Sequence, residues 1–496
     1  MLTGMIKVLS AGDMDKLHDA ALTVLQNAGL RIHGRFLLEA LREHGCKVDF
    51  DDMRAWFDPA LVEKQIAGQK GRCKQARSSL WYPFCKETPG DGVAYADDFC
   101  VDYGYAVPTV LDMETHILRP ASRNDQMELI KLGNAIPEVK AINSNVIPHE
   151  LPPAIEVIES AGDLILNTPK PGWVGAYDAV QARYLAEFAQ LFTNHDAQTL
   201  KTAPPFFVNA YCTTSPLKID DRTCNVLEEA MKHGFPVNFC TMPILGATTP
   251  VTVAGSVVVG AAELLGAITA ATLINPDVYY YQTCIASELD MRTMNPCYAT
   301  PSAVLTDAAM HQLFKFKYGL VTNVEPHYVE GNAPSIQTTF VKMYRLMTLA
   351  QTASMPLSIG LLANGSVFSG VQAMIDLDFA KAMHRFSRGV EVNDGTMAVD
   401  LIQEMLFCDR DSYLTADMTL DNYAELLWQS EILDRGAPHL NGEALNFHAS
   451  DEKLIKRAYE KYHALLSGAP EYEAPAHIRT ETAKIIAAAR REILGG

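Results

Sequence analysis

Seven short runs of β-branched and aromatic residues recur along the middle of the chain at a nearly constant spacing. They begin at residues 139, 172, 206, 237, 278, 321 and 357, so that 33, 34, 31, 41, 43 and 36 residues separate consecutive starts. Each interval leaves room for one helix, and strands that are joined through helices run parallel. A further, less regular run near residues 99–105 brings the expected number of units to eight.

Eight such units predict an α/β protein with a (β/α)8 TIM barrel, and the roughly 280 residues that they occupy suit that fold. A doubly wound sheet is the alternative, although no GxGxxG motif follows any run, so its dinucleotide-binding form lacks its fingerprint. We expect an N-terminal helical and hairpin cap over 1–95, the barrel over 96–395 and C-terminal helices packed on the barrel over 396–496.

The cap and the C-terminal region both show helical patterns. Residues 12–70 predict three helices, of which the first is capped by Asp13 and ended by Gly29. The stretch from Val251 to Ile274 is long and apolar enough to span a membrane, with Glu263 as its one charged residue. Three glycines, several threonines and the absence of flanking Lys or Arg favour a buried helix instead.

Composition excludes several classes of function. The 496 residues contain 41 Lys and Arg against 59 Asp and Glu, a formal net charge of −18, without a basic run. Nucleic acid and anionic membrane surfaces are therefore unfavourable partners. Ten scattered cysteines form no CxxC pair, and the N-terminus has no apolar secretory region, so we expect a cytoplasmic protein with reduced thiols.

In a barrel of this kind the chemistry lies at the carboxyl ends of the strands. Here those ends carry mainly aromatic and amide side chains on the inward face, with few charges: Asn143, Asn145, Trp173, Tyr177, Asn209, Tyr211, Asn238, Cys240, Tyr279, Tyr281, Asn323, Glu325 and His327, with Phe368 beyond the last strand. Aromatic walls suit a quaternary ammonium group, which each ring binds by about 0.5–2 kcal/mol.

Other interpretations of the same residues stay open. The Tyr and Trp side chains could simply fill the barrel, and the Asn side chains could bind neighbouring loops. Glu325 and His327 could form an acid–base pair, or His327 could be structural. A zinc site at Cys212, Cys240 and Cys284 is disfavoured because Cys212 is out of phase with Tyr211.

The segment MPILGATTPVTVAG, Met242 to Gly255, closely resembles the signature of the trimethylamine–corrinoid methyltransferase family. Further segments resemble landmarks of the same family: LDMRT at 289–293, Ser215-Pro216-Leu217, LHDAALTVLQNAGL at 17–30, and 376–400. Two segments depart from it, HYVEGNAPSIQTTF at 327–340 and Met294-Asn295. The resemblance therefore covers nearly the whole chain.

This resemblance implies a barrel that moves a methyl group from a methylated amine to cobalt(I) of a separate corrinoid protein. Trimethylamine members carry pyrrolysine, whereas this sequence holds only standard residues. It therefore resembles the non-pyrrolysine branch, whose members demethylate glycine betaine first among quaternary amines, with proline betaine, carnitine or butyrobetaine as alternatives. No DxHxxG motif is present, so cobalamin should arrive on the cognate corrinoid protein.

A quaternary ammonium leaves as a neutral amine, so we expect no acid–base catalyst, no metal and no tightly bound cofactor in this chain. Arg292 or His327 should bind a substrate carboxylate. The substrate-binding residues that we predict are Asn145, Trp173, Tyr177, Tyr211, Tyr281, Arg292, His327 and Phe368. Two other hypotheses stand beside this one: a betaine-binding barrel without turnover, and a metal-dependent lyase or hydrolase that uses Glu325 and His327. Self-association is compatible with the sequence and is not fixed by it.

Overall fold

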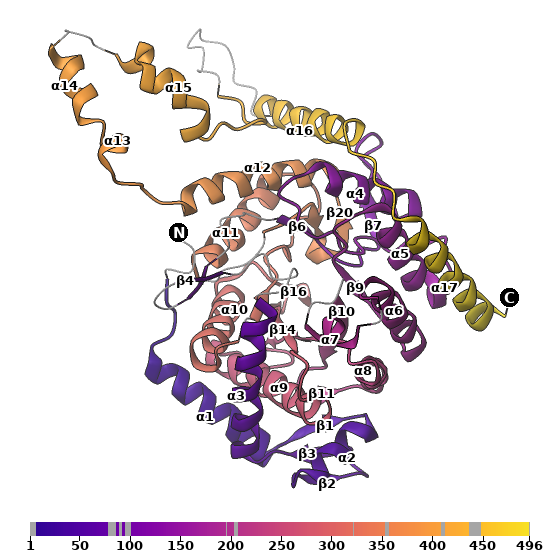
Figure 1. Cartoon of the computed structure of the whole chain (residues 1–496). Coiled ribbons are helices and arrows are strands. Elements are labelled where there is room, and N and C mark those ends of the chain that lie inside the picture. Colours follow the sequence, from indigo (N-terminus) through magenta and orange to yellow (C-terminus); the bar gives the residue numbers. More distant parts are fainter. Residues whose placement is uncertain are drawn as a thin grey trace.

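The structure is a computed structural model of the whole chain (Figure 1). It describes residues 6–77, 86–88, 92–94, 101–194, 196–202, 207–320, 322–352, 357–407, 412–435 and 448–495.

The centre of the molecule is an array of short parallel strands. Five of them pair side by side in the order β17–β14–β12–β10–β9. Their bounds are β9 (Trp173–Gly175), β10 (Phe207–Thr213), β12 (Val237–Thr241), β14 (Tyr281–Cys284) and β17 (Thr322–Val324). Each lies within one of the runs whose spacing predicts strands.

Three more segments extend this array. β6 (Val101–Tyr103) pairs in parallel with β18 (Leu357–Ile359). The run near residue 139 joins both groups, because isolated parallel bridges connect Val139 to Val101 and Ile142 to Pro171. Eight parallel segments thus follow one another, and in the described part of the chain no pairing joins β17 to β18. The mixed α/β class is confirmed, while closure of the barrel stays a prediction.

Helices separate successive strands and surround the array (Figure 1). They are α4 (Arg123–Ala135), α5 (Pro153–Asn167), α6 (Ala179–Phe192), α8 (Asp221–Lys232), α9 (Val253–Ile274), α10 (Pro301–Gln312), α11 (Ile336–Thr352) and α12 (Gly370–Ser387). Helix α9 is apolar on all sides because it lies between the array and the cap, and 78% of its most apolar window is buried. Its Glu263 accepts hydrogen bonds from Thr213, Ser215 and Thr241, as expected of a satisfied core acid.

The N-terminal cap packs against α9. It contains three helices, as predicted, and a small sheet, namely α1 (Ala11–Asn27), α2 (Arg35–Glu43) and α3 (Pro59–Arg77) with β1 (Leu30–Ile32), β2 (Lys47–Asp49), β3 (Arg54–Trp56) and β11 (Lys218–Ile219). The prediction that Asp13 caps α1 is wrong. Ser10 is the N-cap, and Asp13 is the third helical residue of a capping box with it. Gly29 follows the end of α1 with φ +71°, which confirms it as the stop signal.

The C-terminal region divides into two parts. Helices α16 (Ala449–Ser467) and α17 (Ala476–Leu494) pack on the outer helices, α16 on α12 and α4, and α17 on α5 and α6. Residues 388–407 and 412–433, which we call the arm, mostly project away from the body instead (Figure 1). The arm returns to the body at its end, where Ser430 and Glu431 bind Asp378 of α12 and Ile432 is buried. The arm contains α13 (Asp394–Met397), α14 (Val399–Phe407) and α15 (Asp417–Leu426).

Candidate functional site

A cavity of about 120 Å³ lies at the carboxyl ends of the parallel strands. The end of each parallel strand delivers side chains to the same edge, so residues far apart in sequence converge there. Fifteen residues line the cavity: Asp102, Tyr103, Gly104, Tyr105, Asn143, Trp173, Asn238, Cys240, Met242, Thr283, Ile285, Asn323, Glu325, His327 and Tyr328.

Of the predicted substrate-binding residues, Trp173 and His327 line this cavity. Three others lie against lining residues. Tyr281 packs edge-on against Trp173 with ring centroids 6.4 Å apart, and Phe368 contacts Tyr103 in the same way at 5.8 Å. The Nδ2 of Asn145 donates to the carbonyl of Gly104 at 3.2 Å. These three side chains therefore support the cavity wall.

The remaining predicted residues lie elsewhere. The Arg292 side chain is 91% exposed at the tip of the hairpin formed by β15 (Ser287–Asp290) and β16 (Asn295–Cys297), with its Nε 3.2 Å from Asp290. Tyr177 is half-buried, and the guanidinium of Arg222 lies 5.8 Å from its ring centroid. The side chain of Tyr211 falls outside the described residues. Substrate contact by these residues stays a prediction.

Aromatic rings contribute to the wall of the cavity. Tyr103, Tyr105, Trp173 and Tyr328 all belong to the lining, and Tyr328 stacks at a tilt on His327 with centroids 4.8 Å apart. Tyr103 is fully buried, and burial raises the pKa of its hydroxyl well above the ordinary value. Neutral rings that face a confined space favour an organic cation.

Two carboxyl groups also line the cavity, where the sequence predicted few charges. Asp102 accepts a hydrogen bond from the hydroxyl of Ser358, and Glu325 accepts one from Nδ2 of Asn323 at 2.5 Å. Burial raises the pKa of Asp102 to about 6. Burial, with the nearby charge of Asp102, raises the pKa of Glu325 to about 8. Burial therefore favours the protonated form of both carboxyls, and the charge of Asp102 favours the protonated form of Glu325 further.

His327 lies next to this pair. Its Nδ1 is 3.0 Å from Oε2 of Glu325, although the two atoms lack hydrogen-bond geometry. Burial, with the positive charges of Lys342 and Arg345, holds the pKa of His327 well below its ordinary value. The imidazole is therefore neutral at pH 7 and can donate one hydrogen bond.

A buried ionic network fixes the loop that carries Glu325 and His327. Arg345 of α11 is completely buried, and its guanidinium donates to Asp307 at 2.7 Å, to the carbonyl of Tyr298 at 2.6 Å and to the carbonyl of Glu325 at 2.8 Å. One turn away, Lys342 donates to Asp376 at 2.7 Å. The sequence signal for this network was available, since both cations of α11 lie three residues apart.

Asn143 takes the supporting role that the sequence left open for the strand-end amides. Its Nδ2 donates to the carbonyl of Tyr103 at 2.7 Å, and its Oδ1 accepts from the backbone of Trp173 at 2.8 Å. It thereby joins two neighbouring lining segments. Within the described residues, no group of three His, Cys, Asp or Glu side chains is placed to hold a metal ion.

Aromatic rings and two carboxyl groups thus share one small cavity at the ends of the parallel strands. The sequence profile of the trimethylamine methyltransferase (MTTB) family matches residues 2–493, so this chain belongs to that family of methyltransferases. Family members act on methylated amines and work with a corrinoid protein.

Individual relatives agree with this assignment. The chain is 26% identical to the trimethylamine methyltransferase MttB of Desulfitobacterium hafniense (strain DSM 10664 / DCB-2), over 91% of this chain and 87% of that protein. It is 23% identical to a glycine betaine methyltransferase of Desulfitobacterium hafniense (strain Y51), over 87% of each chain. Among solved structures, the monomethylamine methyltransferase MtmB of Methanosarcina barkeri matches with a TM-score of 0.50 and 14% identity, over 95% of this chain and 90% of that one, which shows a likeness of fold.

Proposed function

We propose that this protein transfers a methyl group from a quaternary amine, glycine betaine above all, to cobalt(I) of a separate corrinoid protein. The observation that carries the proposal is the combination of aromatic rings with a buried carboxyl pair in one small cavity. A relative that bears the name glycine betaine methyltransferase supports the same substrate class.

The cavity offers complementary groups for both ends of a betaine. Asp102, Tyr103 and Tyr105 all line the cavity, so the proposed ammonium group is bound there by a carboxylate together with aromatic side chains. After the end of β17, protonated Glu325 and neutral His327 offer hydrogen-bond donors to the substrate carboxylate. Glycine betaine is the most compact of the candidate betaines, and the small size of the cavity favours it over the longer carnitine.

In the proposed step, the C–N bond breaks as the Co–C bond forms. The electron pair of the C–N bond stays on nitrogen, which leaves as the neutral amine of dimethylglycine, and cobalt(I) supplies the pair for the new bond. No proton moves. The residues of this chain hold the C–N bond in line with the approaching cobalt and exclude water. The reacting atoms are therefore already oriented when cobalt arrives. The negative charge of ionised Asp102 offsets the cost of taking the cation out of water.

The proposal includes two structural points. The array is taken to close into a (β/α)8 barrel between β17 and β18, because α11 joins them with the same strand–helix–strand connection as the other units. The corrinoid protein then docks over the strand ends, where the cavity lies. Within the described residues no disulfide joins the thiols of Cys46, Cys73, Cys224, Cys240, Cys284 and Cys297, and reduced thiols are compatible with a cytoplasmic location.

Calorimetric binding of matched ligands tests the site. Glycine betaine should bind at least about tenfold more tightly than 3,3-dimethylbutyrate, which has the same shape without the positive charge, because cation–π contacts and the Asp102 charge act only on the cation. Asp102→Asn should abolish most of that preference. Equal affinities for the two ligands in the unaltered protein would contradict a cation site.

A further inference from the structure

The arm is a group of helices with almost no core of its own. Within α13, α14 and α15, Met405 is the one buried residue. Fourteen large apolar side chains of the arm are at least 42% exposed: Val390, Val392, Met397, Val399, Ile402, Leu406, Phe407, Tyr413, Leu414, Leu420, Tyr423, Leu426, Leu427 and Leu433. A typical monomer keeps even its largest contiguous apolar patch to about 300–600 Å², so this many exposed large apolar side chains on short helices call for a partner surface.

Among the described residues, helix α11 presents a second exposed apolar surface. Ile336, Phe340, Met343 and Met347 are between 37% and 73% exposed, and their spacing of four, three and four residues places them on one face. Both cations of this helix, Lys342 and Arg345, are buried on the opposite face. A helix that exposes its apolar residues and buries its charges is suited to contact with another protein surface.

The position of the arm argues against the corrinoid protein as its partner. The arm follows the C-terminus of α12, and Lys381 in the last half of that helix lies 3.5 Å from Glu138, which directly precedes the run that begins at residue 139. The arm therefore begins at the end of the array opposite to the cavity. A corrinoid protein that docks over the strand ends would leave the arm exposed to solvent. A second copy of this chain, in contrast, supplies the apolar face of α11.

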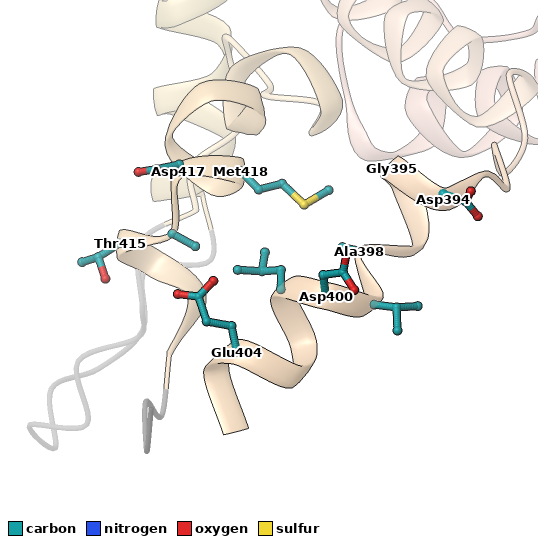
Figure 2. A pocket seen from close by; sticks show the side chains of 11 residues that line it. Asp394, Gly395, Ala398, Asp400, Glu404, Thr415, Asp417 and Met418 are labelled. Carbon is teal, nitrogen blue, oxygen red and sulfur yellow. The ribbon is translucent and has the colours of Figure 1, made fainter. Parts of the chain in front are cut away.

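The charges of the two surfaces are complementary. Figure 2 shows the groove of about 610 Å³ between α14 and α15, whose lining includes Asp394, Asp400, Glu404 and Asp417. At the C-terminal end of α11, the backbone of Ile6 donates to Gln351 at 3.0 Å, which places the N-terminal segment there. In that region Lys7 and Lys315 lie 5.2 and 5.5 Å from the ring of Phe316. An acidic groove thus fits a basic end.

We propose that the arm of one copy binds the α11 face of a second copy, and that the reciprocal contact closes a two-fold dimer. Apolar arm residues cover Ile336, Phe340, Met343 and Met347, while the acidic groove faces the Lys7 and Lys315 end. Each copy supplies one arm and one α11 face, so the contact is self-complementary and does not propagate into a fibre. The inference is independent of the methyl transfer proposed above.

Sedimentation velocity on the full chain tests this dimer. The unaltered protein should be dimeric, and Phe340→Asp or Leu406→Asp should each weaken the dimer by at least about tenfold, as expected for a charge in an apolar interface. Ile117→Asp, at a side chain 60% exposed on another face, is the matched control and should leave the dimer intact. Both test residues are exposed, and unchanged circular dichroism and thermal midpoints should show that the variants fold.

Mixing the two variants tests the pairing itself. A heterodimer of Phe340→Asp with Leu406→Asp keeps one intact arm on one intact α11 face, so the mixture should associate more strongly than either variant alone. A monomeric unaltered protein would overturn the proposal. So would a dimer that loses association with Leu406→Asp and not with Phe340→Asp, since the arm would then contact some other surface.

Discussion

Two buried carboxyls with raised pKa values make the affinity for glycine betaine depend on pH in both directions. Below about pH 6 Asp102 becomes protonated, and the cation loses its counter-charge. Above about pH 8 Glu325 ionises and repels the substrate carboxylate. We expect the tightest binding between these values and a rise in Kd on both sides, measured by calorimetry from acidic to alkaline buffers.

A cation without a carboxylate provides the control for this pH dependence. Tetramethylammonium should show the acidic limb and lack the alkaline loss, because it has no group for Glu325 to repel. Asp102→Asn should remove the acidic limb for both ligands. If both ligands weakened equally above pH 8, Glu325 would not face the substrate carboxylate.

Trp173 is the predicted aromatic residue that lines the cavity, and its ring should carry part of the cation affinity. Trp173→Phe keeps an aromatic face and should weaken betaine binding only a few-fold, whereas Trp173→Ala should weaken it by about tenfold or more. Trp56→Ala, in the cap, is the matched control and should leave Kd unchanged. Equal losses of betaine affinity in the Phe and Ala variants would mean that Trp173 fills space in the cavity and makes no cation–π contact.

At the scale of elements, α11 is fixed to the strand ends by Arg345. Replacing Arg345 with Met leaves Asp307 buried without its cation, which should lower the free energy of unfolding by about 3–5 kcal/mol. Arg35→Met removes an exposed pair with Glu39 and should cost at most about 1 kcal/mol. Urea unfolding of both variants measures the difference. Asp307→Asn should recover part of the loss in the Arg345→Met background, and no recovery would mean that the buried charge is not the cause.

The elements were largely predictable because their signal is local. Each strand run is short, apolar and followed by a helix, so spacing alone located β9, β10, β12, β14, β17 and β18. The ends of α1 depended on capping chemistry, where Ser10 and Asp13 offer the same kind of group three residues apart. The arm was predicted as helical, and its lack of a core is a tertiary property that periodicity does not reveal.

The cavity residues were harder to predict because alternation gives the face of a strand and not the depth. Tyr281 and Thr283 share a face of β14, yet Tyr281 begins the strand and lies one layer deeper, while Thr283 lines the cavity. Asp102 was missed because the run near 99–105 carries a weak strand pattern. Arg292 lies on an exposed hairpin tip and outside the lining of this cavity, so its contact with a substrate stays a prediction.

At the scale of the whole molecule, the cavity and the arm lie apart, so that methyl transfer and association of two copies use different surfaces. The cavity lies at the strand ends, where a methyl acceptor must approach, and the arm begins at the opposite end of the array, beside Glu138. Association of two copies through the arm would thus leave both cavities accessible. Phe340→Asp should consequently retain the betaine affinity of the unaltered protein, and calorimetry on the monomeric variant would show whether the two tasks are independent.

Methyl transfer to cobalt(I) tests the central proposal most directly. The purified protein would be mixed with its cognate corrinoid protein or with free cob(I)alamin, and with glycine betaine, proline betaine, carnitine or trimethylamine in turn. Formation of methylcobalt would be followed by absorbance, and dimethylglycine by mass. We predict methylcobalt and dimethylglycine in equal amounts from glycine betaine. Tight betaine binding without methylation of either acceptor from any of these amines would contradict the proposal and indicate a binding protein.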